Sequence, residues 1–333
     1  MGWRGLLRDP QAASRRAERE AYRCQRALQK QQQQFDRMQD FERAQHEVEL
    51  YENRIALLTS VPKESGDRWN WKAIKAAPPP AKPVRSHDNE RRAQFALTAY
   101  VPVLLDRFLG RAGSKRAELD EAVESARRMD KRDYRQAIED FKSAMTDWEA
   151  SRRFAARVLA GDLDAYTEAI RETDPFSDLS VLGSSIRFQI PTPHTIVSTL
   201  QVNSNRSIPQ EIKTLLKTGR VSVKPMPTSR FFEIYQDYVC GCALRVAREL
   251  FALLPVKMVV VTAIGEILNS ATGHLEEHPI LSAAVPRRTV DLINWETADP
   301  SDAMANFVHR MCFKRSKGLS PVEPIELSEL QIE

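Results

Sequence analysis

The chain has 333 residues, enough for two globular units and an extended segment, which excludes a small disulfide-stabilised scaffold. Its composition is 42% hydrophobic and 28% charged, which is typical of a folded protein and not of a disordered one. The 49 Lys and Arg nearly balance the 45 Asp and Glu, and a net charge of +4 gives little support for a general nucleic-acid-binding surface.

The cysteines and the first residues both favour a cytoplasmic protein. Cys24, Cys240, Cys242 and Cys312 are spread over the chain and lack the dense spacing of an extracellular disulfide framework. The opening residues, MGWRGLLRDP, hold too short an apolar stretch for a signal peptide, and Leu6 stands where a myristoylation signal needs Ser or Thr. We therefore expect neither export nor a lipid anchor.

Residues 1–61 are predicted to form a coiled-coil arm, because the stretch from about Pro10 to Ser60 has no internal Pro or Gly and repeats apolar residues at helical spacing. The apolar residues follow two heptad frames, a weak first frame and a stronger second one. A three-residue shift of the heptad register after Met38 joins the two frames. The first frame comprises Ala21, Cys24, Leu28, Gln31, Phe35 and Met38. In the second frame, the residues predicted to carry oligomerisation are Phe41, Val48, Tyr51, Ile55 and Leu58. A helix this long needs a partner, which is either a second copy or the later part of its own chain.

Residues 62–89 read as a Pro-rich linker. Pro78, Pro79, Pro80 and Pro83 favour a stiff, extended spacer. The nearby pair Trp69 and Trp71 permits two interpretations: a motif that docks a partner, or anchors that hold the linker to the body of the protein.

Residues 90–175 are predicted to form a helical bundle or hairpin. Apolar residues recur in steps of three and four, at Leu97, Val101, Leu104 and Phe108 and again at Tyr134, Ile138, Phe141, Met145 and Trp148. Pro102 should kink the first helix, and Gly110 and Gly113 should end it. Gly161 and Asp162 should separate the last long helix from a short one.

Residues 176–333 are predicted to form an α+β domain with a largely antiparallel sheet packed by helices. The expected strands are Ser184–Ile190, Ile196–Val202, Val256–Ile264 and Ile280–Val285, and the expected helices are Pro209–Thr218, Ser229–Leu254 and Ser301–Phe313. The apolar stretch 250–268 approaches membrane-span length, but Pro255 and Lys257 interrupt it, so we interpret it as a helix end, a turn and a buried strand.

The segment from His274 to His278 (HLEEH) fits the H-x-x-E-H pattern of inverzincin zinc proteases. That chemistry needs both histidines on one face of a stable helix. Here the segment follows Gly273, precedes Pro279 and connects two predicted strands, so a polar loop is favoured over a zinc hydrolase.

A second set of metal-compatible side chains combines Cys240 and Cys242 with His309 and Cys312. The two cysteines fall within a predicted helix, where residues two apart point in nearly opposite directions. His309 and Cys312 should share one face of the predicted last helix. Buried structural cysteines are the favoured interpretation.

The other catalytic motifs that we considered are either in an unsuitable structural context or absent from the sequence. Glu211 and Lys213 supply the Glu-x-Lys half of a metal-dependent nuclease motif, but Pro209 places them at the start of a predicted helix. The chain has no G-x-S-x-G, no G-x-G-x-x-G and no phosphate-binding loop. We expect no cofactor; the sequence leaves enzymatic activity open and favours a protein that is not an enzyme.

The leading prediction for function is a self-associating interaction or assembly protein whose C-terminal domain binds another protein. The alternative is a nucleic-acid-binding accessory or bacterial defence protein that uses a C-terminal basic patch. That patch would comprise Arg287, Arg288, Lys314, Arg315 and Lys317.

Overall fold

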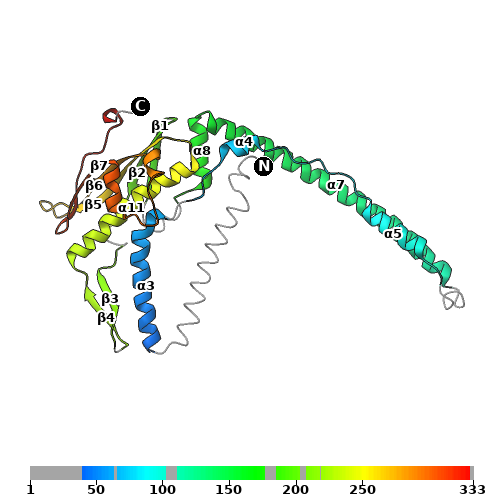
Figure 1. The fold of residues 1–333 in the computed structure, drawn as a ribbon, viewed down its shortest axis with the longest axis horizontal. Helices are drawn as coiled ribbons and strands as arrows, with labels where there is room; N and C mark the ends of the chain where they lie inside the picture. The colour runs from blue at the N-terminus through cyan, green and yellow to red at the C-terminus, as the bar shows by residue number, and fades with distance from the viewer. Residues whose placement is uncertain are drawn as a thin grey trace. The chain divides into compact units, whose positions relative to one another are not determined.

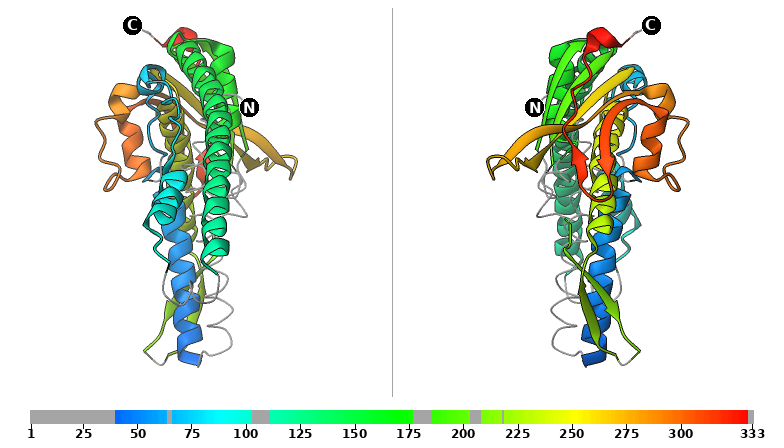
Figure 2. Two further views of the ribbon diagram at one scale, coloured as in Figure 1. Left: turned by 90° about the vertical axis from the view of Figure 1, so that its right-hand side faces the viewer. Right: turned by 90° about the vertical axis from the view of Figure 1, so that its left-hand side faces the viewer.

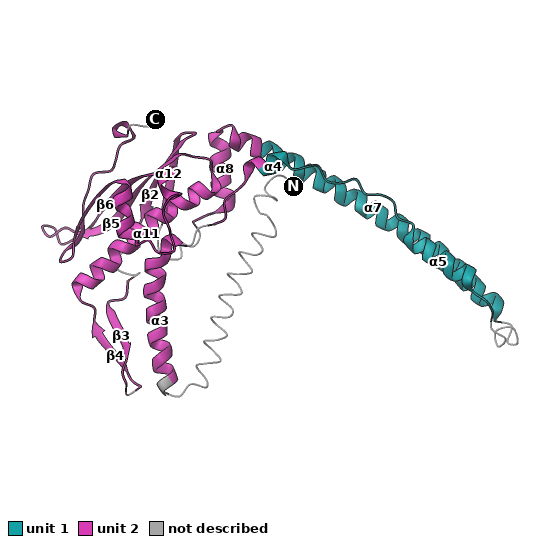
Figure 3. Cartoon of the chain, viewed as in Figure 1, with its two compact units in different colours: residues 1–6, 73–154 teal, residues 7–72, 155–333 magenta. Residues whose placement is uncertain are grey.

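The computed structural model describes residues 40–63, 66–102, 111–176, 185–202, 208–217 and 219–330. The first predicted heptad frame, Cys24 included, lies outside the described residues. Within them the fold is a mixture of helices and a mostly antiparallel sheet, which confirms the predicted fold class. The chain forms two compact units (Figure 3): unit 1 contains residues 73–154, and unit 2 contains residues 40–72 and 155–330.

Unit 1 is built on one very long helix. Helix α7 runs from Ala112 to Leu159, and its last five residues belong to unit 2. The shorter α5 (Asp88–Ala99) lies beside it, and the chain enters unit 1 through α4 (Trp71–Ala76). Helix α5 ends before Pro102, because a residue that precedes proline disfavours helical backbone. Residues 103–110, which hold the predicted Leu104 and Phe108, lie outside the described residues.

Unit 2 contains a six-stranded sheet in the order β1-β2-β5-β6-β7-β8. Strands β2 and β5 are parallel, and the connection between them includes α11, which gives the long crossover that a parallel pair needs. The other neighbouring pairs are antiparallel. The strands are β1 (Ser185–Thr192), β2 (Thr195–Gln201), β5 (Met258–Leu268), β6 (Leu275–Pro286), β7 (Val308–Lys314) and β8 (Gly318–Ser320). The predicted largely antiparallel sheet is confirmed.

Helix α11 (Thr228–Leu253) forms the core of unit 2. It covers one face of the sheet and also packs against α3, the single turn η1 (Val61–Lys63) and the short helix α13 (Pro300–Ala303). Because α11 is contacted on several sides, its buried residues lie on almost every face of the helix. Gly265 of β5 fits closely here, since an added Cβ would lie 2.7 Å from Cδ1 of Ile280 and 2.9 Å from the hydroxyl of Tyr235 on α11, so these side chains would have to shift. The short helix α8 (Leu163–Thr173) also packs on α11, and its first turn is capped by Asp162.

The apolar stretch 250–268 forms a helix end, a turn and a strand, as predicted: α11 ends at Leu253, and β5 begins at Met258. Of the helices in the described residues, none is long and apolar enough to cross a bilayer.

Helix α3 (Asp40–Ser60) packs within its own chain. It contacts α11 and a separate hairpin formed by β3 (Glu211–Leu215) and β4 (Val221–Pro225), as Figure 1 shows. Lys213 of β3 forms an ion pair with Glu47 of α3, with Nζ and Oε1 2.7 Å apart. The helix predicted at Pro209–Thr218 is therefore wrong, because pairing with β4 and packing on α3 override a helical spacing only a few residues long.

The helix predicted at Ser301–Phe313 is also wrong. Its first part forms α13 and the turn η2 (Met304–Asn306), and the remainder is β7, which pairs with β6 from Leu281 to Ala284. The hydrogen bonds of the sheet outweigh local helix propensity in this segment.

The two linker tryptophans bind the body of unit 2. The backbone N–H of Trp69 donates to the Ala252 carbonyl at 2.8 Å, and Trp71 Nε1 donates to the Leu253 carbonyl at 2.6 Å. Their rings stack with centroids 5.1 Å apart. They satisfy backbone oxygens that the end of α11 would otherwise leave unpaired, so the anchor interpretation is confirmed.

Candidate interaction surfaces

The two helices of unit 1 meet around a buried carboxylate. Asp130 of α7 is 5% exposed and accepts hydrogen bonds from the backbone N–H groups of Asn89 (3.3 Å) and Glu90 (2.9 Å) and from Asn89 Nδ2 (2.8 Å). These are first-turn donors of α5, which have no partner inside their own helix. A carboxylate from α7 thus caps α5 at its positively polarised end.

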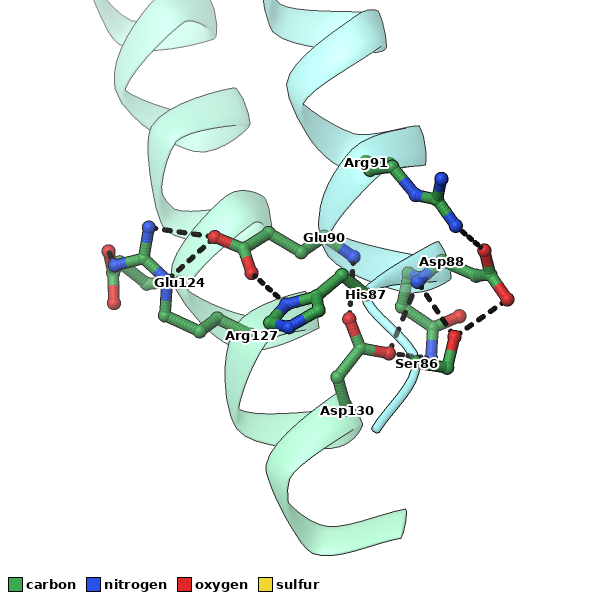
Figure 4. Close-up of polar contacts among 9 residues, drawn as sticks. Ser86, His87, Asp88, Glu90, Arg91, Glu124, Arg127 and Asp130 are labelled. Atoms are coloured by element: carbon green, nitrogen blue, oxygen red, sulfur yellow. Dashed lines mark hydrogen bonds and ion pairs between the residues drawn. The ribbon is translucent and has the colours of Figure 1, made fainter. Parts of the chain in front are cut away.

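Charged side chains surround this cap (Figure 4). Arg127 of α7 donates to Glu90 through Nε at 2.9 Å and forms an ion pair with Glu124 at 2.8 Å. His87 contacts the other oxygen of Glu90 at 3.2 Å. Hydrogen bonds lower the pKa of Asp130, chiefly the one from the Glu90 N–H, and His87 and Arg127 lower that of Glu90. The cluster fixes the register of α5 on α7.

Helix α5 covers only a short part of α7. Val123 and Ala126 of α7 are buried. Further along α7 the apolar seam continues, but its members are only half-buried: Tyr134, Ile138, Phe141, Met145 and Trp148. The neighbour of this stretch is the extended segment 77–87, which runs along α7 in Figure 1. Trp148 Nε1 donates to the Ala77 carbonyl at 2.8 Å, so the Pro-rich segment is a strap on α7. An extended strap covers less of a helix than a second helix does, so part of this seam remains open.

Charges along α7 are grouped in blocks of alternating sign. An acidic block is followed by a basic block, a second acidic block and a basic pair. In chain order these blocks hold Glu118, Asp120, Glu121 and Glu124; then Arg127, Arg128, Lys131, Arg132 and Arg135, with two aspartates; then Glu139, Asp140, Asp147 and Glu149, with one lysine; then Arg152 and Arg153. Like charges therefore recur four residues apart, which destabilises an isolated helix by about 0.2–0.5 kcal/mol per pair.

Unit 2 offers a second surface, the β5–β6 ribbon. Residues 265–268 and 275–278 extend past the ends of the neighbouring strands, and the ribbon stands out from the sheet in Figure 2. Leu268 and Leu275 face each other across it and are 61% and 52% exposed. The pair places two exposed large apolar side chains on the projecting ribbon.

The HLEEH residues do not form a joint site. His274 precedes β6 and His278 lies on it, so the four steps along the chain from one histidine to the other span about 13 Å of extended backbone. His278 contacts Glu276, with Nε2 and Oε2 3.5 Å apart. The favoured polar loop is wrong for most of the segment, which is strand. The helical geometry that a zinc protease needs is also missing.

The cysteine set is separated as well. Cys240 and Cys242 lie in α11 as predicted and are fully buried, and burial raises the pKa of Cys242 to about 12 and raises that of Cys240 too. Cys240 contacts Met311 of β7, with the two sulfurs 3.7 Å apart. His309 and Cys312 are on β7, where residues three apart point to opposite faces, so the predicted shared helix face is wrong. Among the described residues, no group of three or more His, Cys, Asp or Glu could hold a metal ion.

The basic residues lie at two ends of the sheet. Arg287 and Arg288 follow β6, whereas Lys314, Arg315 and Lys317 lie at the turn between β7 and β8, about 30 Å away along the antiparallel strands. Arg287 points inward and donates to the carbonyls of Val256 (2.7 Å) and Phe251 (2.8 Å). Arg315 forms an ion pair with Glu233 at 3.0 Å. The structure does not bring these residues into one patch.

The residues predicted to carry oligomerisation lie on α3 within unit 2. Val48 and Leu58 are buried, and Tyr51 and Ile55 are half-buried. Of the two partners left open for this helix, α3 packs on its own chain.

Sequence reasoning missed Asp130, although a signal for it exists. In the spacing Leu119, Val123, Ala126, Asp130, Tyr134, an acidic residue occupies a seam position. A carboxylate at a seam position needs hydrogen-bond donors from a neighbouring element.

No protein-family model, curated protein or solved structure matches this chain.

Proposed function

We propose that the protein is a non-enzymatic assembly protein, which self-associates through the arm of unit 1 and carries unit 2 as a partner-binding module. The arm is defined as α5, residues 112–154 of α7, and the strap 77–87. One observation carries the proposal: the apolar seam of α7 from Tyr134 to Trp148 is only half-buried, and its covering is an extended strap. Half-buried apolar side chains at helical spacing are suited to packing against another helix.

The seam of α3 is less available for association. Val48 and Leu58 are already buried inside unit 2, and among the side chains of that frame that the structure describes, Tyr51 and Ile55 are half-buried. The ribbon with Leu268 and Leu275 supports the second half of the proposal, because it offers exposed apolar side chains on unit 2.

The test is the molar mass of the full chain by sedimentation equilibrium over a range of concentrations, with two variants of α7. Phe141→Asp places a charge in the half-buried seam and should weaken association at least about tenfold. Ser143→Asp places the same charge on an exposed position two residues away and should leave association unchanged. Circular dichroism checks that both variants fold. A wild-type chain that stays monomeric at every concentration would refute the proposal.

A further inference from the structure

We propose that the strap 77–87 is a docking site for a second protein, a module whose groove is lined by aromatic side chains and bears acidic residues on one side. The site consists of the two edges of the strap that face away from α7. The inference goes beyond the proposed self-association, because it concerns a different partner and a surface outside the seam of α7.

The prolines of the strap restrict its backbone to one conformation. Each proline fixes its own φ near about −65° and favours extended backbone in the residue before it. The prolines are Pro78, Pro79, Pro80 and Pro83, and residues 77–87 form neither helix nor strand. These restrictions favour a polyproline II helix, which has three residues per turn and no internal hydrogen bonds.

Two contacts with α7 require the strap to be extended. Trp148 Nε1 donates to the Ala77 carbonyl at 2.8 Å, and Asn89 Nδ2 donates to Asp130 at 2.8 Å. The stretch of α7 between these contacts is about 27 Å long. Residues 77–89 would reach about 37 Å as a polyproline II helix but only about 18 Å as an α-helix. Only the extended form can join the two contacts.

Burial along the strap repeats every third residue. Ala77, Pro80 and Pro83 are half-buried, whereas the residues between them are exposed. A period of three is that of a polyproline II helix with one edge against a surface. One edge of the strap therefore lies on α7, along which it runs in Figure 1, and the other two edges are open.

The two open edges differ in chemistry, since one is apolar and the other is basic. The apolar edge comprises Pro78, Ala81 and Val84, and the basic edge comprises Pro79, Lys82 and Arg85. Val84 is 89% exposed, which is unusual for a large apolar side chain. An occupant of this surface must therefore offer apolar surface and negative charge together.

This combination selects the chemistry of the partner. Protein modules of the SH3 and WW classes bind polyproline II segments in grooves lined by aromatic side chains. The strap loses little conformational entropy on binding, because its contacts with α7 already hold it in the required form. Lys82 and Arg85 add positive charge along one edge, so acidic residues on that side of the groove complement them.

The packing on α7 also determines which prolines a partner can reach. Pro80 and Pro83 have the P-x-x-P spacing of many polyproline ligands, but both lie on the edge that faces α7. A module that binds the strap in place must therefore contact Pro79 and not Pro83. This difference distinguishes binding to the docked strap from binding to a strap released from α7.

The first test is direct binding to the full chain, with a panel of purified SH3 and WW domains as probes. Each domain is isotopically labelled, and its NMR spectrum is recorded as the full chain is added. At least one domain should bind with a Kd below about 0.1 mM, and the largest shifts should come from the aromatic residues of its groove. Failure of every domain in the panel to bind at this limit would overturn the proposal.

A matched pair of proline variants then tests the open edges. Pro79→Ala and Pro83→Ala each remove one proline from the strap, so both lower its preference for extended backbone. Pro79→Ala should weaken binding about tenfold, because it deletes a ring that the groove contacts. Pro83→Ala should change the Kd less than about twofold. A loss with Pro83→Ala as large as that with Pro79→Ala would overturn the assignment of the edges.

Charge reversal tests the acidic side of the groove. The double variant Lys82→Glu with Arg85→Glu should weaken binding at least about tenfold. Lys115→Glu with Arg116→Glu is the matched control, because it makes the same change in net charge at exposed positions about 21 Å along α7 from Asp130. The control should bind like wild type. Equal binding by the two double variants would overturn the basic edge as part of the site.

The two proposals fail separately. A monomeric wild-type chain that binds a domain of the panel refutes self-association alone. An oligomer that binds none of the domains leaves self-association standing and refutes docking on the strap.

Discussion

Asp130 accepts a hydrogen bond from the backbone N–H of Glu90 at 2.9 Å, and this contact joins the middle of α7 to the first turn of α5. The two helices otherwise share a narrow interface, and α5 has no buried residue of its own. Docking of α5 must therefore depend strongly on polar contacts at this one point. Because a buried carboxylate needs its donors and the first turn of α5 needs an acceptor, each side of the contact satisfies the other.

Replacing Asp130 with alanine should release α5 from α7. The first-turn N–H groups of α5 would lose their acceptor, and we expect backbone amides of residues 88–99 to exchange with deuterium about tenfold faster. Hydrogen exchange measured by mass spectrometry on the full chain reports this directly. Asp133→Ala is the matched control, because its side chain is exposed on the same helix. Equal protection of α5 in both variants would contradict the role of Asp130.

Stability of the same contact should depend on pH. The pKa of Asp130 is lowered in the folded state, so its ionised form stabilises the fold above the usual aspartate pKa of about 3.9. That contribution is lost as pH falls through the lowered folded pKa. Protection of α5 should therefore decline below about pH 4, and Asp130→Ala should show a smaller decline. Asp88 and Glu90 also have lowered pKa values, so some pH dependence should remain in the variant.

Elements with a long apolar pattern could be predicted from the sequence. Elements that depend on pairing with a distant strand could not. Helix α11 was predicted within one residue at each end, because its apolar pattern extends over 26 residues. Strands β3 and β7 were predicted as helices, because each is short and gains its hydrogen bonds from a strand elsewhere in the chain. The α7 seam and its charge blocks can be read from spacing, whereas the cap on α5 depends on residues 40 positions apart.

Leu58 and Leu57 should respond very differently to the same substitution. Leu58 is fully buried where α3 packs within unit 2, whereas its neighbour Leu57 is 51% exposed. Leu58→Ala should lower the free energy of unfolding by about 2–5 kcal/mol, since it removes buried methyl groups and leaves a cavity. Leu57→Ala should change it by less than about 0.5 kcal/mol. Urea denaturation of both variants measures the difference, and equal midpoints would contradict the packing of α3 on its own chain.

Arg287 should be a structural residue. Its guanidinium donates to the carbonyl of Phe251 in the last turn of α11 and to that of Val256 just after the helix, and it stacks on Phe251, 4.8 Å from the ring centroid. Arg287→Ala should destabilise unit 2 by about 2–3 kcal/mol, because the carbonyls lose a charged donor. Arg288→Ala changes the exposed neighbour and should be nearly neutral. Thermal unfolding compares the two variants. If both were neutral in stability, the assignment of Arg287 to the cap of α11 would be wrong.

Thiol reactivity distinguishes buried structural cysteines from an accessible one. Cys240 and Cys242 are buried in α11 with raised pKa values, so few of their thiols are ionised at neutral pH, and reagents cannot reach them. Cys312 is exposed on β7. Iodoacetamide at pH 8 should therefore label Cys312 in the native protein and should label Cys240 and Cys242 only after denaturation. Peptide mapping by mass spectrometry reads each site separately. Rapid native labelling of Cys242 would show that α11 is not packed on all sides as described.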